Sequence, residues 1–286
     1  MKLIKKLATA AAVSFAMVGA AHADSILNNW VFNPNGTGFA GGQVINEQLD
    51  INGSAFIQLT AQNATNFTFT ENATFNSVQA DGNGSLFPIT FGKTITATFS
   101  GYGTGTFGGS FTFTGGTLSI YSSANGVYST TAGTYGADTG TLIATFDVLM
   151  GGGGLVTATG SPLGNGQITV NAVANAPGGL TPGYFFNGNG TDLSQSNVLS
   201  FAFTNANTTG APTANQVSEI ICDYSGYQGA GCGTTGGTYA NTATDFFVSN
   251  NGQFKLGQVP EPGSLALFGI AMLGAGVVSR KRASKA

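Results

Sequence analysis

Few side chains in this 286-residue chain could carry out catalysis, and their types exclude most mechanisms. The single histidine is His22, and the residues after it offer no imidazole for a Ser-His or Cys-His pair or for a metal site. Carboxylates remain, because two facing carboxyl groups can hydrolyse a glycoside without histidine. Eleven acidic residues lie between Asp24 and Gly257, but their order in the sequence does not pair them in space. We therefore assign no catalytic residue and expect a protein that is not an enzyme.

Cys222 and Cys232 are the two cysteines of the sequence, and they enclose a glycine-rich segment. Two cysteines this close form a disulfide in an oxidising compartment, where closing the loop stabilises the fold by about 2–3 kcal/mol. A free reactive thiol is one alternative, and a metal pair, which would lack its other ligands, is another. We predict a disulfide between Cys222 and Cys232.

Three short motifs resemble cofactor or metal loops without their full context. Residues 103–108 spell the dinucleotide fingerprint, but the next segment is strand-like and no acidic residue follows about twenty positions on. Residues 50–54 and 81–85 begin like calcium loops, but both lack the glutamate that ends an EF-hand. We expect a loop between strands at 103–108 and Asx-rich turns at the other two, with weak calcium binding as the alternative. No cofactor and no metal ligand is assigned.

Alternating residue types indicate the strands that would position these groups. Large apolar residues alternate with threonine, serine, alanine or asparagine in residues 67–70, 95–99, 111–114, 168–171 and 199–204. Such period-two strands bury phenylalanine and other large apolar side chains on one face and expose threonine on the other. Turn signals such as Asn125-Gly126 separate them at short intervals. The pattern predicts an all-β body, an antiparallel sandwich or jelly roll, with no capped amphipathic helix and with residues 151–154 as a loop inside one domain.

The charge of this body is strongly negative. Between Asp24 and Gly257, Lys93 and Lys255 are the only basic residues, against eleven acidic ones, which gives a net charge of −9. The whole-chain value of −3 hides this, because seven of the nine basic residues lie near the two ends. A body so poor in cations neutralises phosphates badly, so nucleic acid and anionic lipid surfaces are excluded as partners.

The first 23 residues predict a secretory signal helix. Lysines at positions 2, 5 and 6 precede an apolar stretch over residues 7–20, and Ala21-His22-Ala23 forms a small-x-small cleavage site. An ordinary first helix is the alternative, but it would be apolar on nearly every face. Cleavage after Ala23 would start the mature chain at Asp24.

The last 29 residues predict a membrane helix with a break before it and a basic end after it. Val259, Pro260, Glu261 and Pro262 come first, and the prolines prevent a helix from continuing into the body. Residues 263–279 are uncharged and span about 25 Å as a helix, the lower limit for crossing a bilayer core. The run ends at Arg280-Lys281-Arg282, which the positive-inside rule places on the cytoplasmic side.

This C-terminal segment resembles the PEP-CTERM sorting signal of Gram-negative bacteria, whose cells pair it with a membrane exosortase and with exopolysaccharide genes. The resemblance covers about a tenth of the chain and implies that Pro260, Glu261 and Pro262 are recognised by an exosortase, which removes or exchanges the tail. The body resembles the flocculation-associated PEP-CTERM proteins of floc-forming bacteria in residues 29–34, 105–113 and 247–254. That second resemblance implies a role in holding cells together within secreted polysaccharide.

The sequence thus predicts a signal peptide over residues 1–23, an extracellular β body over 24–257 and a sorting segment over 258–286. The expected function is a non-catalytic surface or matrix protein that promotes flocs or biofilm through polysaccharide or self-association. A lectin-like module is the first alternative and a two-carboxylate glycosidase a remote one. In a lectin, exposed aromatic rings would stack on sugars, and the candidates are Trp30, Tyr102, Tyr121, Tyr128, Tyr184, Tyr224, Tyr227 and Tyr239.

Overall fold

The computed structural model describes residues 25–82, 85–88, 92–163, 166–208, 211–233 and 236–258. One compact unit runs from Ile26 to Gly257, and a second joins Met1–Ser25 to Gln258–Ala286. The predicted signal helix, its cleavage site, the sorting motif, the membrane helix and the basic tail lie outside the described residues. Their structures therefore stay predictions.

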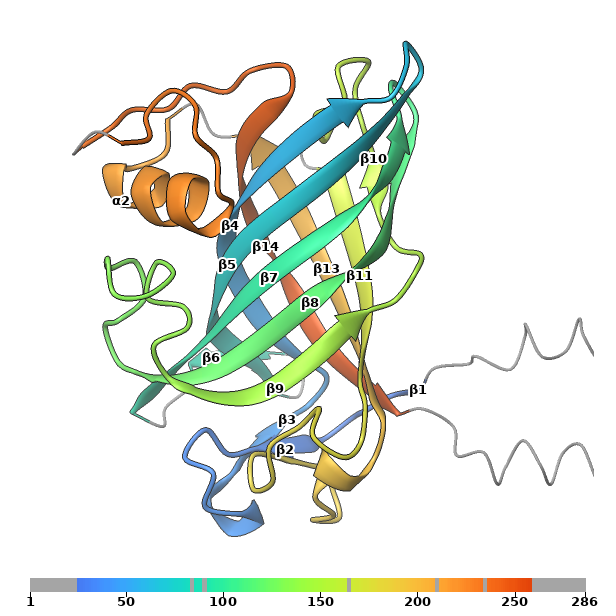
Figure 1. Cartoon of the computed structure of the whole chain (residues 1–286). Helices are drawn as coiled ribbons and strands as arrows, with labels where there is room; N and C mark the ends of the chain where they lie inside the picture. Colours follow the sequence, from blue (N-terminus) through green and yellow to red (C-terminus); the bar gives the residue numbers. More distant parts are fainter. Residues whose placement is uncertain are drawn as a thin grey trace, which may run out of the picture. The chain divides into compact units, whose positions relative to one another are not determined.

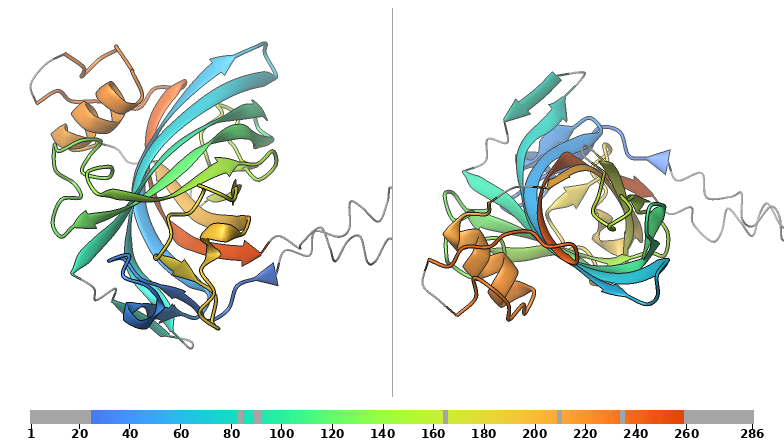
Figure 2. Two further views of the ribbon diagram at one scale, coloured as in Figure 1. Left: turned by 60° about the horizontal axis from the view of Figure 1, so that its bottom comes forward. Right: turned by 90° about the horizontal axis from the view of Figure 1, so that it is seen from above.

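The Ile26–Gly257 unit is built on one sheet that closes on itself. Each long strand is hydrogen-bonded to the next long strand along the chain, and the last pairs with the first over eleven residues (Figure 1). Seen from above, the strands surround a common axis (Figure 2). The eight strands are β4 Gln48–Ala61, β5 Asn66–Gly82, β7 Lys93–Thr106, β8 Ser110–Ala124, β9 Thr141–Val148, β11 Gly166–Ala174, β13 Val198–Thr208 and β14 Asp245–Gln258.

This closed antiparallel sheet confirms the all-β prediction but not its topology. A sandwich or jelly roll has two sheets packed face to face and long Greek-key connections. Here successive strands are neighbours, so the sheet is an eight-stranded up-and-down barrel-like sheet without free long edges. The alternation of apolar and polar residues is the same in both architectures, which is why it did not distinguish them.

Short elements decorate the sheet and fill one of its ends. β1 Ser25–Ile26, β6 Ser85–Pro88 and β10 Gly154–Leu155 pair with β14, β5 and β8. A second sheet contains β12 Phe185–Phe186, β2 Trp30–Phe32 and β3 Gln43–Ile45, with the short turns η1 Phe39–Gly41 and η2 Leu193–Gln195 nearby in the chain. The rings of Trp30, Phe32 and Phe185 pack together in the main core. This aromatic cluster closes one end of the interior.

One ion pair joins this end to the main sheet. Lys255 Nζ on β14 lies 2.5 Å from Glu47 Oε1, and the backbone carbonyl of Glu47 accepts a hydrogen bond of 3.3 Å from the Trp30 indole. The Lys255 and Glu47 side chains are partly buried, 14% and 34% exposed. Glu47 thus contacts both β14 and the aromatic cluster.

The predicted alternation holds in most strands and is inverted in β13. On β5, Phe67 and Phe69 are buried in the core while Thr70 is exposed. On β13, Thr204 is paired with the buried Ile168 of β11, so its side chain shares the interior face. Phe203, one residue earlier, therefore faces outward and is only half-buried. The prediction that the phenylalanines of residues 199–204 form the core face is wrong.

Glycines on the interior face of β7 make room for the phenylalanine rings of β5. A Cβ at Gly103 would lie 2.7 Å from the Phe69 ring and would also collide with the carbonyl oxygen of Thr112. A Cβ at Gly105 would likewise collide with the Phe67 ring. Residues 103–106 are the end of β7 and residues 107–108 lie in its hairpin, so the predicted loop is limited to the last two of the six residues. Gly103 and Gly105 make room for rings.

A short helix was missed by the sequence analysis. α2 Ala214–Gln216 continues directly into a π-helix, η3 Val217–Tyr224, and Thr213 with Gln216 forms a capping box at its start. The Thr-x-x-Gln spacing is a sequence signal for this cap. Ile220 and Ile221 of η3 are buried against Phe56 and Phe247 on the outer face of the sheet, forming a second core. Burial of this face stabilises a helix that would be too short to form alone.

No helix among the described residues is long and apolar enough to cross a membrane. The predicted membrane helix over residues 263–279 lies outside those residues, so this finding does not test it.

Candidate functional site

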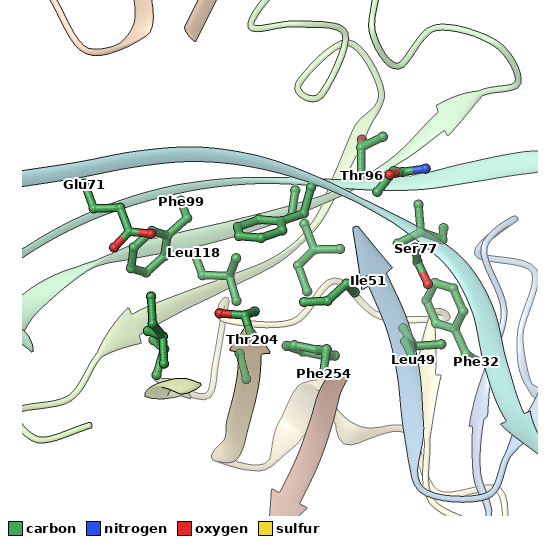
Figure 3. A pocket seen from close by; sticks show the side chains of 18 of the residues that line it. Phe32, Leu49, Ile51, Glu71, Ser77, Thr96, Phe99, Leu118, Thr204 and Phe254 are labelled. Atoms are coloured by element: carbon green, nitrogen blue, oxygen red, sulfur yellow. The ribbon is translucent and has the colours of Figure 1, made fainter. Parts of the chain in front are cut away.

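The interior of the closed sheet contains a cavity of about 60 Å³. Its walls are mainly apolar side chains contributed by most of the long strands, with Phe32 and Phe185 at the filled end. Figure 3 shows Phe99, Leu118, Ile51 and Phe254 along this lining. A second, smaller cavity of about 10 Å³ lies in the same interior, bordered by Val156 and Pro162 of the loop after β10.

Glu71 borders both cavities and is the one ionisable side chain among the described residues that line them. It lies on β5 in the inward row that runs from Phe69 to Ala73, and only 4% of its surface is exposed. Burial raises the pKa of its carboxyl group from an ordinary 4.5 to about 7. Among the described residues, its carboxyl group has no hydrogen-bond or ion-pair partner. Figure 3 shows the carboxyl pointing into the cavity.

Two glycines explain why Glu71 has space in front of it. The residue paired with Glu71 on β7 is Gly101, and the residue paired with Gly101 on β8 is Gly116. A Cβ at Gly101 would lie 2.5 Å from the Phe99 ring, so a larger residue does not fit without movement. Toward β7 and β8, the carboxyl group therefore has no side chain at its level, whereas its register partner on β4 is the buried Ile57.

Other polar groups reach the interior but do not contact Glu71. Ser77 and Thr204 line the larger cavity (Figure 3). Asn250 on β14 is 4% exposed, and its Oδ1 atom is buried without a hydrogen-bond partner among the described residues. The interior thus combines apolar walls with a few polar groups: the Ser77 hydroxyl donates to the Asp50 carbonyl oxygen at 3.3 Å, whereas Asn250 Oδ1 has no partner among the described residues.

The outer face of β4, β5, β7 and β8 carries a different surface, which we call the threonine face. In register it places hydroxyl side chains side by side across the four strands, and it has no charged residue in these rows. Tyr102 lies among them and is 55% exposed. Its phenol end lies over Gly115, where a Cβ would approach the hydroxyl to 2.5 Å. The threonine face comprises Thr60, Thr68, Thr70, Tyr102, Thr104, Thr112 and Thr114.

Only Tyr102 among the predicted aromatic candidates offers a largely open ring. Trp30 is fully buried in the end cluster, and Tyr239 is 5% exposed in the second core. The others are half-buried, namely Tyr121, Tyr128, Tyr184, Tyr224 and Tyr227.

The Cys222–Cys232 disulfide is formed, as predicted, with its Cα atoms 5.5 Å apart. It ties the end of η3 to the following loop. Tyr227, inside that loop, packs edge-on against Phe56 on β4, with ring centroids 5.3 Å apart. The disulfide therefore supports the packing of the helix on the sheet and lies apart from the interior cavity.

One of the two calcium-like segments does not form the turn that was expected. Residues 50–54 lie inside β4, paired with both β5 and β14, so the Asx-turn interpretation is wrong there. At the other, Gly82 at the end of β5 pairs with Ser85 at the start of the antiparallel β6, and residues 83–84 lie outside the described part, so the Asx-rich turn stays a prediction. In the part of the chain that the structure describes, no group of three or more acidic, cysteine or histidine side chains could hold a metal ion.

Glu71 was counted in the sequence only as one of eleven acidic residues. Its position was readable, because it continues the period-two row of Phe67 and Phe69 on the core side. The alternation within β5 does not predict that the sheet closes, and therefore does not predict the cavity in front of Glu71.

The fold and these surfaces define the class of protein: a closed antiparallel sheet with an apolar interior cavity and an uncharged threonine face on the outside of four strands. A family model for the PEP-CTERM protein-sorting motif matches residues 258–282, so the chain carries that sorting motif at its C-terminal end. The motif implies recognition by an exosortase and export to the envelope or surface of a bacterial cell. Comparisons with curated proteins and with solved structures give no significant match.

Proposed function

We propose that this is a non-catalytic surface or matrix protein of a Gram-negative bacterium that promotes floc and biofilm formation together with exopolysaccharide. Signal peptidase and an exosortase would process it during export, and the C-terminal helix would hold it in the membrane until then. Outside the cell its partners would be polysaccharide or further copies of the chain.

The observation that carries the proposal is the threonine face. Its hydroxyl groups can exchange hydrogen bonds with a neutral sugar polymer, and the exposed Tyr102 ring offers an apolar surface on which a sugar ring can stack. The net charge of −9 over residues 24–257 makes a phosphate-rich partner unfavourable by comparison. An uncharged, hydroxyl-rich face of the sheet suits an uncharged polysaccharide.

The proposal of a non-catalytic role draws support from the interior. Two-carboxylate hydrolysis needs a second carboxyl group about 5 to 9.5 Å from the first. Among the described residues that line the two cavities, Glu71 has no such companion. This arrangement favours binding over glycoside hydrolysis.

Deletion of the gene in the host tests the proposal. We expect the flocs to disperse while polysaccharide secretion continues, and the wild-type gene to restore them. The Tyr102→Ala variant should restore flocs only in part, because it removes the stacking ring. A matched control is Met150→Ala, which truncates a side chain that is 79% exposed in the loop after β9. Unchanged flocs in the deletion strain would contradict the proposal.

A lectin-like module with a defined sugar specificity is the second candidate, and the exposed Tyr102 ring favours it as well. Glycan-array binding by the exported protein separates the two. Saturable binding to one sugar that Tyr102→Ala abolishes indicates a lectin. Weak binding to many neutral polymers indicates a matrix protein.

A further inference from the structure

The interior of the sheet brings together space, apolar walls and one carboxyl group without a partner among the described residues. Glu71 stands between a cavity of about 60 Å³ and one of about 10 Å³. Burying a polar group without a hydrogen bond costs free energy, and native proteins leave few such groups. A carboxyl group held in this position is available to bind something inside the sheet.

The walls restrict what that molecule can be. Most lining residues are apolar, so the ligand must be mainly apolar too. Above about pH 7 the Glu71 carboxyl group is ionised and only accepts hydrogen bonds, so there the polar group of the ligand must donate one. An anionic head group would face Glu71 with no cation among the described lining residues to offset the repulsion.

The volume sets the size. An apolar cavity of about 150 Å³ holds a benzene molecule. A cavity of about 60 Å³ therefore suits a ligand of only a few heavy atoms, such as a short alkyl chain with one polar end.

We propose that the interior of the sheet is a binding site for a small, mainly apolar molecule whose amine or hydroxyl group donates a hydrogen bond to Glu71. Thr204 and Ser77, which line the same cavity, supply hydroxyl groups beside the apolar walls. The site is separate from the threonine face and does not depend on binding of polysaccharide.

Calorimetric titration at pH 8 of the exported protein, purified from its host, with ethylamine, ethanol and acetate tests the proposal. We expect saturable binding of the amine and the alcohol, and binding of acetate that is weaker by at least about tenfold. The comparison of amine with alcohol distinguishes an ion pair from a neutral hydrogen bond. Absence of binding by both the amine and the alcohol would overturn the proposal.

Three variants locate the binding. Glu71→Gln keeps the volume but removes the charge, and should weaken ethylamine binding by at least about tenfold while changing ethanol binding far less. Ala202→Leu fills the cavity and should abolish binding of both, with circular dichroism to confirm that the variant is folded. Asp223→Asn removes an exposed carboxyl group on η3 and should change nothing. Equal binding by wild type, Glu71→Gln and Ala202→Leu would place the ligand elsewhere and refute the assignment.

Discussion

At the scale of single residues, Glu71 makes the stability of the fold depend on pH. Its carboxyl group has a pKa of about 7 in the folded chain and an ordinary value of 4.5 in the unfolded one, because burial disfavours the charge. Below pH 4.5 the carboxyl group is mostly protonated in both the folded and the unfolded state, so it does not make stability depend on pH there. As the pH rises from 4.5 to about 7, the unfolded state loses its proton first and stability falls.

The Glu71→Gln variant should remove this dependence. Relative to the variant, the wild type should lose about 3 kcal/mol of unfolding free energy between pH 4.5 and 7, from the pKa difference at 1.36 kcal/mol per unit. Urea unfolding at several pH values in this range measures it. Asp223→Asn serves as the control and should follow the wild type. A constant difference between wild type and Glu71→Gln across the range would contradict the buried, unpartnered state of Glu71.

Tyr102 and Glu71 differ in how far the sequence reveals them. Tyr102 was one of eight aromatic candidates, and its exposure follows from Gly115 beneath its ring, a residue on the next strand. The inward position of Glu71 can be read from the alternation of its own strand, because it lies two residues after the buried Phe69. Its isolation depends on Gly101 and Gly116 across the sheet, which only the register of three strands brings together.

At the scale of elements, the disulfide should stabilise the helix on the outer face more than the sheet itself. It closes a ten-residue separation, for which loop-closure entropy predicts about 2–3 kcal/mol. The Cys222→Ala/Cys232→Ala double variant should lose protection from hydrogen exchange in η3 and the loop to Cys232 while the amides of β7 and β8 keep theirs. Equal loss of protection in all of these elements would show that the helix and sheet unfold as one unit.

The strands were predictable as strands, and the helix was not predicted although its cap was visible. Thr213-Ala214-Asn215-Gln216 is a capping box, but η3 after it has only eight residues, fewer than the roughly 11–18 in which a helical period can be read. The apolar residues of η3 are the ones that pack against Phe56 and Phe247 on the sheet. In β13 the two-residue alternation was predicted correctly, but the choice of the inward face was wrong. Ala202 and Thr204 face the interior, and Phe203 faces outward.

At the scale of the whole molecule, closure of the sheet determines what the protein can do. Pairing of β14 with β4 removes the long free edges that would otherwise favour aggregation in the extracellular medium. It also creates an inside and an outside with different chemistry. The sequence shows the alternation that both faces need, but the return of the last strand to the first is a long-range contact that local patterns do not encode.

The sorting motif at residues 258–282 connects this fold to its place of action. If the two termini are export signals, the Ile26–Gly257 unit is what remains outside the cell. The acidic, histidine-free character of that unit, its disulfide and its threonine face are then properties of the working protein.

Intact-mass analysis of the protein isolated from its host tests this account most directly. We predict a chain that starts at Asp24, is processed near Pro260-Glu261-Pro262, and gains two hydrogen atoms on reduction of the disulfide. A chain that retains both Met1 and Ala286, with free thiols and in the soluble cytosolic fraction, would contradict it.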